Sequence, residues 1–282
     1  MRVGITILPE YPWTEARARW RAAEELQFDD AWTFDHIGFG SLLDVPWYGA
    51  VPTLAVAAEA TSTIRLGTLV STPNFRHPVP FARELIGLDD ISGGRFTAGL
   101  GSGNHEGYDT RVFGSRDPVT HRGRRFAEFV ELLDLLLRRD KVTWRGDYYE
   151  AVEARNVPGC VQQPRLQFVV AANGPDAMAV AARYAAGWIT TGTHEVDSLD
   201  AWWDSVAAIS AQFTAPGVRR ILQTDAAPVY SLSSVECFLE FVGRAGELGF
   251  TDVAVPWPRS AGPFAGRESI VEEVAAARPT AT

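Results

Sequence analysis

The chain has 282 residues, of which 46% are hydrophobic and 22% charged, a composition typical of a soluble globular protein with a large core. Its formal net charge of −9 disfavours nucleic acids and anionic membranes as partners, because basic surfaces bind both. Cys160 and Cys237 belong to no paired motif, which argues against a disulfide framework or a zinc site. The start MRVGITILP lacks signal-peptide features and no apolar run is long enough to span a membrane, so we expect a cytoplasmic protein.

Short apolar runs typical of buried strands alternate with helical patterns along the chain. The expected strands are Val3–Leu8, Asp30–Phe34, Ile64–Val70, Phe96–Leu100, Gln167–Ala171, Trp188–Thr191, Arg219–Thr224 and Asp252–Val255. The expected helices are 14–26, Pro52–Thr61, Pro78–Ile91, 126–139, Pro175–Ala186, Ser198–Phe213, Ser234–Leu248 and Ser269–Ala277. Eight strands alternating with eight helices predict an α/β fold, the (β/α)8 TIM barrel.

One segment interrupts this alternation. VTWRGDYYEA (142–151) predicts a small hairpin that turns on RGDY. We find no internal repeat, linker or low-complexity block, and only the tail RPTAT is expected to fray. The prediction is therefore a single barrel domain over residues 1–282.

The loops that follow the strands carry the chemistry of a barrel, and here they are rich in Gly, Asn, Thr and aromatic residues. The carboxylates expected on this rim are Asp35, Glu106 and Asp225, and no two of them form an obvious glycosidase pair. Four histidines, His36, His77, His105 and His194, lie in these loops without metal-ligand spacing, so we expect no metal. A rim of exposed backbone suits a planar, polar ligand that bears a phosphate.

The glycine-rich segment GGRFTAGLGSGN (93–104) is a poor dinucleotide fingerprint, because Asn104 stands where the third glycine is needed and no helix follows. A different reading comes from three segments in consistent order: ELQFDDAWTFDHI (25–37), TSTIRLGTLVSTPNFRHPVPFARELIGLDDISGGRFTAGLGSGN (61–104) and VVAANGPDAMAVAARYAAGWITTG (169–192). They resemble the bacterial luciferase-like flavin and deazaflavin oxidoreductases, and most closely the branch that uses coenzyme F420. The resemblance covers about the first two thirds of the chain.

The resemblance implies how the cofactor lies. Its ring would rest on a non-proline cis peptide between Leu69 and Val70, and glycines after strand 4 would let backbone pass close to it. We expect Asn173 to cap the helix that Pro175 opens, whose N-terminus attracts phosphate. The implied cofactor-binding residues are Asp35, Leu69, Val70, Thr72, Gly101, Gly103, Asn104, Ala172, Asn173 and Gly174.

The resemblance also places His36 on the substrate side. An imidazole ordinarily titrates near pH 6.5 and can exchange a proton with substrate at neutral pH. If His36 only packs, its loss would cost stability rather than rate, and His105, Glu106 or His194 would be the next candidates. The expected walls of the substrate pocket are Phe39, Trp47, Tyr108, His194 and Trp257.

The function implied by the resemblance is hydride transfer between coenzyme F420 and a small organic substrate, by a homodimer. An FMN-dependent luciferase-like monooxygenase or reductase is the first alternative, because a deazaflavin does not activate oxygen as a flavin does. A non-catalytic barrel that binds a flavin is the second.

Overall fold

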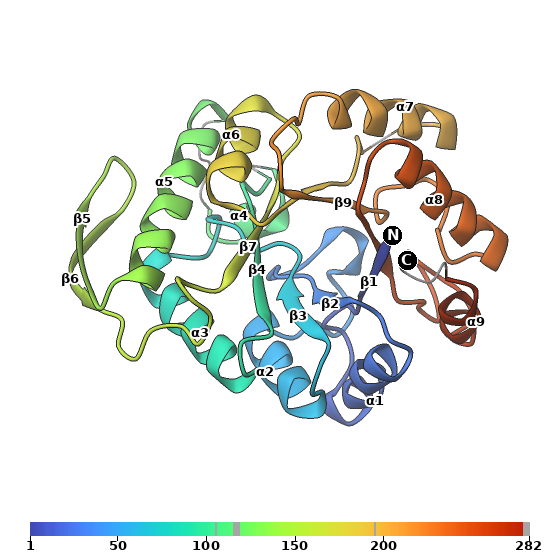
Figure 1. Cartoon of the computed structure of the whole chain (residues 1–282), viewed down its shortest axis with the longest axis horizontal. Coiled ribbons are helices and arrows are strands. Elements are labelled where there is room, and N and C mark those ends of the chain that lie inside the picture. The colour runs from blue at the N-terminus through green and yellow to red at the C-terminus, as the bar shows by residue number, and fades with distance from the viewer. Residues whose placement is uncertain (105, 115–118, 195, 279–282) are drawn as a thin grey trace.

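The computed structural model describes residues 1–104, 106–114, 119–194 and 196–278, in which eight parallel strands close into a barrel surrounded by helices (Figure 1). The order of strands around the barrel is β1-β10-β9-β8-β7-β4-β3-β2. The TIM barrel predicted from the alternation of strands and helices is therefore confirmed. Of the tail RPTAT (278–282) that was expected to fray, Arg278 is held by a hydrogen bond from its Nη1 to Gln27 O at 2.9 Å, and residues 279–282 lie outside the described residues.

The elements follow the predicted order closely. The barrel strands are β1 (Arg2–Thr6), β2 (Asp30–Thr33), β3 (Arg65–Thr68), β4 (Phe96–Gly101), β7 (Gln167–Ala171), β8 (Gly187–Thr190), β9 (Arg219–Gln223) and β10 (Asp252–Pro256). The α-helices are α1 (Trp13–Glu25), α2 (Ala50–Ala60), α3 (Pro78–Ile91), α4 (Tyr108–Arg111), α5 (Val119–Arg138), α6 (Pro175–Tyr184), α7 (Leu199–Ser210), α8 (Val235–Glu247) and α9 (Ile270–Ala277). A short 3-10 helix, η1, covers Gly40–Leu42.

Three helical features differ from the sequence prediction. Helix α5 begins at Val119 rather than at residue 126. Helices η1 and α4 were not predicted, because three or four residues are too short to show a helical apolar period. Both short helices lie in loops that follow barrel strands, and α4 carries a residue of the functional site.

The predicted hairpin is confirmed as β5 (Lys141–Arg145) paired with β6 (Glu150–Arg155), which stands outside the barrel beside α5 (Figure 1). Glu128 of α5 holds it in place. The Glu128 carboxylate accepts hydrogen bonds from Trp144 Nε1 at 3.2 Å and from the backbone N–H of Tyr149 at 2.9 Å. The insertion between α5 and β7 is therefore fastened to the outer helix layer and leaves the barrel order unchanged.

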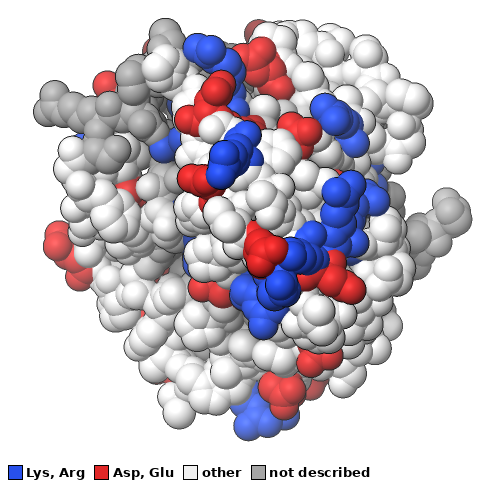
Figure 2. All heavy atoms as spheres, turned by 90° about the vertical axis from the view of Figure 1, so that its left-hand side faces the viewer, with Lys and Arg blue, Asp and Glu red and all other residues white. Residues whose placement is uncertain are grey.

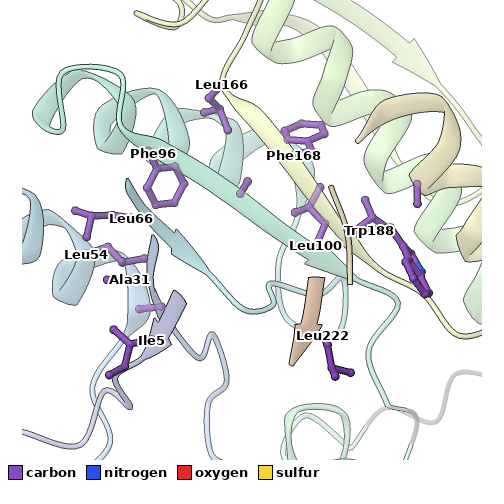
Figure 3. Packing of buried hydrophobic residues seen from close by; sticks show 14 of the residues in the cluster. Ile5, Ala31, Leu54, Leu66, Phe96, Leu100, Leu166, Phe168, Trp188 and Leu222 are labelled. Carbon is purple, nitrogen blue, oxygen red and sulfur yellow. The ribbon is translucent and has the colours of Figure 1, made fainter. Parts of the chain in front are cut away.

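The side chains of the barrel strands alternate between two apolar clusters, as a period of two requires. The larger cluster packs the outer surface of the strands against the helices, and its strand members include Ile5, Ala31, Leu66, Phe168, Trp188 and Leu222 (Figure 3). The smaller cluster fills the barrel interior from the neighbouring strand positions, with Trp32, Leu69, Val169, Ile189, Ile221 and Ala254. The alternation thus separates an outer core from this smaller inner cluster, which we call the plug.

Trp32 is the largest side chain of the plug, and two glycines make room for it. A Cβ on Gly67 would lie 2.4 Å from Trp32 Cζ3, and one on Gly4 would lie 2.8 Å from Trp32 Nε1. Such contacts are shorter than packed atoms allow, so neither position accepts a side chain beside the indole.

The inward residues at the start of the strands form an ionic layer beneath the plug. Arg2 contacts Asp30 and Asp252, each at 3.0 Å, and Arg219 contacts the same two carboxylates. Both aspartates are almost fully buried, so each needs these guanidinium partners. The N-terminal end of the barrel is therefore closed by paired charges.

Acidic and basic side chains are interspersed on the face that carries α5 and the hairpin (Figure 2).

Within the described residues, no helix is both long and apolar enough to cross a membrane.

Glu24 at the end of α1 holds the loop before β3 through hydrogen bonds to its carboxylate, and their contribution to stability can be measured. Its Oε1 accepts hydrogen bonds from the backbone N–H groups of Ser62, Thr63 and Ile64, at 2.8, 2.6 and 3.0 Å. Burial raises the pKa of Glu24, but these hydrogen bonds outweigh it and lower the pKa to about 2. Because the folded-state pKa lies below the unfolded value, the stabilisation is complete above about pH 4.5 and is lost as the pH falls toward 2.

We expect Glu24→Gln to lower the free energy of unfolding by about 1 kcal/mol at pH 7, since solvent screens part of the interaction. The difference from wild type should shrink as the pH falls from 4.5 toward 2. Denaturant unfolding at several pH values measures both, with the exposed neighbour Glu25→Gln as control. A loss of the same size at every pH would show that the charge of Glu24 is not the cause.

Candidate active site

A cavity of about 1240 Å³ opens at the C-terminal end of the barrel. Its lining comes from the loops after β2, β3, β4, β7, β8 and β9, which include the strand ends where barrel enzymes carry their reactive groups. Of the residues predicted for the site, those lining the cavity are His36, Phe39, Leu69, Val70, Thr72, Gly101, Gly103, Asn104, Tyr108, Ala172, Asn173, Gly174 and His194.

The end of β3 contains the non-proline cis peptide bond Leu69–Val70, as the family resemblance predicted. The chain then continues beside β4, because the backbone N–H of Ser71 donates to Gly99 O at 2.7 Å and that of Gly101 donates to Ser71 O at 3.0 Å. A Cβ on Gly101 would lie 2.6 Å from Val70 Cγ2. Val70 therefore presents its side chain to the cavity with glycine backbone against its flank.

The loop after β4 lies against Asn74 of the β3 loop. Gly103 has φ +75°, a conformation that favours glycine, and a Cβ there would come within 2.6 Å of the Asn74 carboxamide. Asn74 Nδ2 donates to Asn104 O at 3.1 Å, and Arg122 Nη1 donates to Gly103 O at 3.2 Å. The backbone of this loop is held close to its neighbours and borders the cavity.

His36 forms the most closely positioned polar pair of the site. Its Nδ1 lies 2.5 Å from Asp109 Oδ2, and Asp109 Oδ1 accepts the backbone N–H of Ile37 at 2.8 Å. Asp109 is almost fully buried, whereas the His36 side chain is 23% exposed and lines the cavity. An imidazole whose Nδ1–H is donated to a carboxylate keeps Nε2 as an acceptor, so this ring can take a proton from a ligand in the cavity.

Asp35 does not line the cavity, so its role as a cofactor ligand stays a prediction. It is buried, and Arg76 binds both carboxylate oxygens, from Nε to Oδ2 at 3.1 Å and from Nη2 to Oδ1 at 2.7 Å. Such a bidentate pair fixes the orientation of the carboxylate. Asp35 and Arg76 tie the loop after β2 to the loop after β3.

Gly174, not Asn173, is the N-cap of α6, and no side chain caps that helix. The Asn173 side chain turns to β8, where its Oδ1 accepts from Thr190 Oγ1 at 2.7 Å and its Nδ2 donates to Gly192 O at 2.9 Å. Pro175 occupies the first turn as predicted. The uncapped N-terminus of α6 is therefore on the cavity wall, where its backbone donors and dipole suit an anionic group.

Two predicted pocket residues lie outside the cavity wall. Trp47 donates its Nε1–H to the backbone oxygen of His36 at 2.8 Å and stacks on Phe39. Trp257 is buried and donates its Nε1–H to Glu268 at 3.0 Å. Each indole N–H holds a loop, and the role of either ring as a substrate wall stays a prediction.

Several cavity residues were not predicted from the sequence. They are Asp109, Arg111, Arg122, Asp176 and Gln223. Asp109 is 73 residues from its partner His36, a separation at which no local pattern links two side chains. Glu106 and Asp225, noted only as rim carboxylates, also line the cavity, while His105 lies outside the described residues. Within the described residues, no group of three or more His, Cys, Asp or Glu side chains could hold a metal ion.

An open polar cavity at the C-terminal end of an eight-stranded α/β barrel defines a ligand-binding barrel of the kind that enzymes use. The chain belongs to the luciferase-like monooxygenase family, whose family model matches residues 1–232. This confirms the family to which the sequence motifs pointed.

Two curated relatives show which proteins the chain is similar to. It is 32% identical over 178 residues to the F420-dependent glucose-6-phosphate dehydrogenase of Amycolatopsis mediterranei (strain U-32), covering 60% of this chain and 50% of the relative. It is 31% identical over 222 residues to the 4-hydroxyprotoasukamycin monooxygenase of Streptomyces nodosus subsp. asukaensis, covering 74% of this chain and 59% of the relative. The chain thus spans about half the length of the curated relatives it matches.

Among solved structures, the chain resembles the coenzyme F420 dependent tetrahydromethanopterin reductase from Methanopyrus kandleri. The TM-score is 0.73 with 19% sequence identity, and the match covers 97% of both chains. At this identity the likeness establishes the fold.

A substitution at Gly101 tests whether the apolar surface formed by Val70, which we call the seat, binds a flavin-like ring. Because Val70 is β-branched and has little rotamer freedom, a methyl group at position 101 must push its side chain into the cavity. We expect Gly101→Ala to weaken binding of F420 or FMN at least tenfold in a fluorescence titration, at a stability cost of about 1–3 kcal/mol. The control is Gly243→Ala in α8, where no atom lies within 4 Å of the added Cβ. Unchanged affinity in Gly101→Ala would place the ring elsewhere.

Proposed function

We propose that the protein is a coenzyme F420-dependent oxidoreductase that transfers hydride between the deazaflavin and a small organic substrate. The observation that carries this proposal is the meeting of the His36–Asp109 pair and the apolar side chain of Val70, flanked by Gly101, in one cavity. The family membership supports it, as does the similarity to a relative named as an F420-dependent dehydrogenase.

The residues of the cavity fit such a cofactor. Val70, flanked by Gly101, offers an apolar seat for a planar ring, and Thr72 and Asn104 border it with polar groups. The uncapped N-terminus of α6 at Gly174 lies further along the same wall and suits a phosphate-bearing tail. We propose that Leu69, Gly103, Ala172 and Asn173 complete this cradle through backbone and side-chain contacts. A bound deazaflavin would supply the carbon that accepts or gives hydride.

In this proposal His36 is the residue that moves the proton. Its Nε2 takes the proton from the hydroxyl of an alcohol that is oxidised, or returns it to the oxygen of a carbonyl that is reduced. Asp109 positions His36, because it fixes the tautomer through Nδ1 and stabilises the imidazolium that forms. Phe39, Tyr108 and His194 are the proposed walls of the substrate pocket.

An FMN-dependent monooxygenase or reductase is the second candidate. It is favoured by the similarity to a relative named as a monooxygenase, and the apolar seat at Val70 would accept either ring. A non-catalytic flavin-binding barrel is the third candidate. We also propose that the protein is a homodimer, which the family resemblance supports. We propose a cytoplasmic location, which the two free cysteines support.

A titration of the purified protein, freed of cofactor, with F420 and with FMN decides between the first two candidates. We expect F420 to bind more tightly, because its longer anionic tail reaches the α6 N-terminus and Arg122. Isothermal calorimetry with both ligands under identical salt gives the ratio of dissociation constants. Micromolar binding of FMN without a response to F420 would overturn the choice of cofactor and leave the fold as described.

We expect His36→Ala to slow single-turnover hydride transfer from a panel of secondary alcohols about 10²–10⁴-fold, with unchanged cofactor affinity and melting temperature. Asp109→Asn should slow it by a similar factor, because an amide facing Nδ1 favours the tautomer that carries the proton on Nε2. The exposed His121→Ala on α5 is the control and should retain the wild-type rate.

The double variant separates positioning from a purely structural role. If Asp109 acts through His36, the double variant should be no slower than His36→Ala, because the two effects do not add. Additive losses would show that Asp109 does not act through His36, and a normal rate in His36→Ala would remove His36 from the mechanism.

A further inference from the structure

Asp225 lies on the cavity wall that faces the cis peptide. It follows β9, which is four strands away from β3 in either direction around the eight-stranded order. Asp225 therefore stands across the barrel mouth from Val70, while His36 follows β2, the strand next to β3. His36 and Asp225 therefore reach the same cavity from two different strands, β2 and β9.

Asp225 lines the cavity, and its Oδ1 is buried with no hydrogen-bond partner among the described residues. The nearby backbone N–H groups of Asp225 and Ala226 act to lower the pKa of the carboxyl group. In Asp35 and Asp109, by contrast, each carboxylate oxygen has a partner. A buried acceptor without a partner is unfavourable, and a ligand that donates to it gains in affinity.

The charges near Asp225 favour a neutral donor. Burial raises the pKa of Asp225 to about 6, although His194, the two backbone N–H groups and His36 act to lower it. Near neutral pH such a carboxyl is close to its titration range, and a hydroxyl group can bond to it in either protonation state. An ammonium group needs the ionised form alone.

Gln223 adds a second polar group to the same wall. It lies two residues before Asp225 on β9, and alternate residues of a strand share one face. Its side chain is 5% exposed and borders the cavity. The wall after β9 thus presents an amide and a carboxyl group in line, an arrangement that suits neighbouring hydroxyl groups.

We propose that the carboxyl group of Asp225 turns toward the cavity and accepts a hydrogen bond from a hydroxyl group of the substrate, so that the substrate class is a hydroxylated compound with one oxygen at His36 and a second hydroxyl at Asp225. This inference rests on the proposed function, which assigns the reacting oxygen to His36. Asp225 is then a specificity residue that selects diols and polyols over simple alcohols.

Three probes of equal size test the proposal: cyclohexanol, trans-1,2-cyclohexanediol and trans-2-aminocyclohexanol. Their dissociation constants are measured by ligand-observed NMR on the wild-type protein, loaded with whichever of F420 or FMN it binds. We expect the diol to bind at least tenfold more tightly than cyclohexanol, the gain of one hydrogen bond to a charged group. Asp225→Ala should remove this preference, and Asp225→Asn should reduce it, since an amide makes the weaker bond.

The matched control is Asp200→Ala on α7, whose side chain is 91% exposed. It should keep the wild-type preference, and all variants should keep the wild-type cofactor affinity. The proposal is overturned if Asp225→Ala retains the diol preference, if wild type shows none, or if the amino alcohol alone depends on Asp225. A loss of cofactor affinity in Asp225→Ala would also overturn it, by assigning Asp225 to the cofactor.

Binding and turnover separate this inference from the proposed function. If the diol preference depends on Asp225 but no hydride transfer occurs with any alcohol, the inference on the binding site holds and the proposed reaction fails. If cyclohexanol and the diol are oxidised with equal efficiency by wild type, and bind equally, the reaction holds and the role of Asp225 fails.

Discussion

The packing of Trp32 against two glycines sets the level at which the barrel is closed. Gly4 and Gly67 leave no space for a side chain beside the indole, so the ring fills the interior and seals it. Beneath it the paired charges of Arg2, Arg219 and their two aspartates close the N-terminal end. Everything above the plug faces the opening. The cavity therefore exists because the interior below it is full.

The inward positions of each strand continue this layering upward. On β9 and its loop, Arg219, Ile221, Gln223 and Asp225 follow one another at every second residue, from ionic base through apolar plug to cavity wall. Regular strands hold the lower members rigidly, and the last member emerges where the strand ends. The directions of Gln223 and Asp225 are therefore set by the buried Ile221, which lies two and four residues before them. This is why a barrel holds its reactive groups with little conformational freedom.

This periodicity explains what the sequence could predict. Strand and helix order follows from local apolar patterns, and the cis bond at Leu69–Val70 and the place of His36 on the cavity followed from motif resemblance. Side-chain partners did not follow. Asp35 and His36 are adjacent in the chain, yet one is buried against Arg76 and the other borders the cavity. The partners of Trp47, Trp257 and Asp109 could not be predicted for the same reason: their contacts join loops that only the closed barrel brings together.

These contacts divide the barrel mouth into two unlike halves. Asp35 to Arg76, Asn74 to Asn104 and His36 to Asp109 cross-link the loops after β2, β3 and β4, so that this half is fixed before any ligand arrives. Among the described residues, Asp225 after β9 has no such cross-link, and in our proposal its carboxyl group is completed by a hydroxyl group of the substrate. Preorganised groups lower the cost of binding and of the reaction, because they need no rearrangement. The cross-linked loops after β2, β3 and β4 suit proton transfer, a step that is the same for every substrate. The wall at Asp225 suits recognition of the groups in which substrates differ.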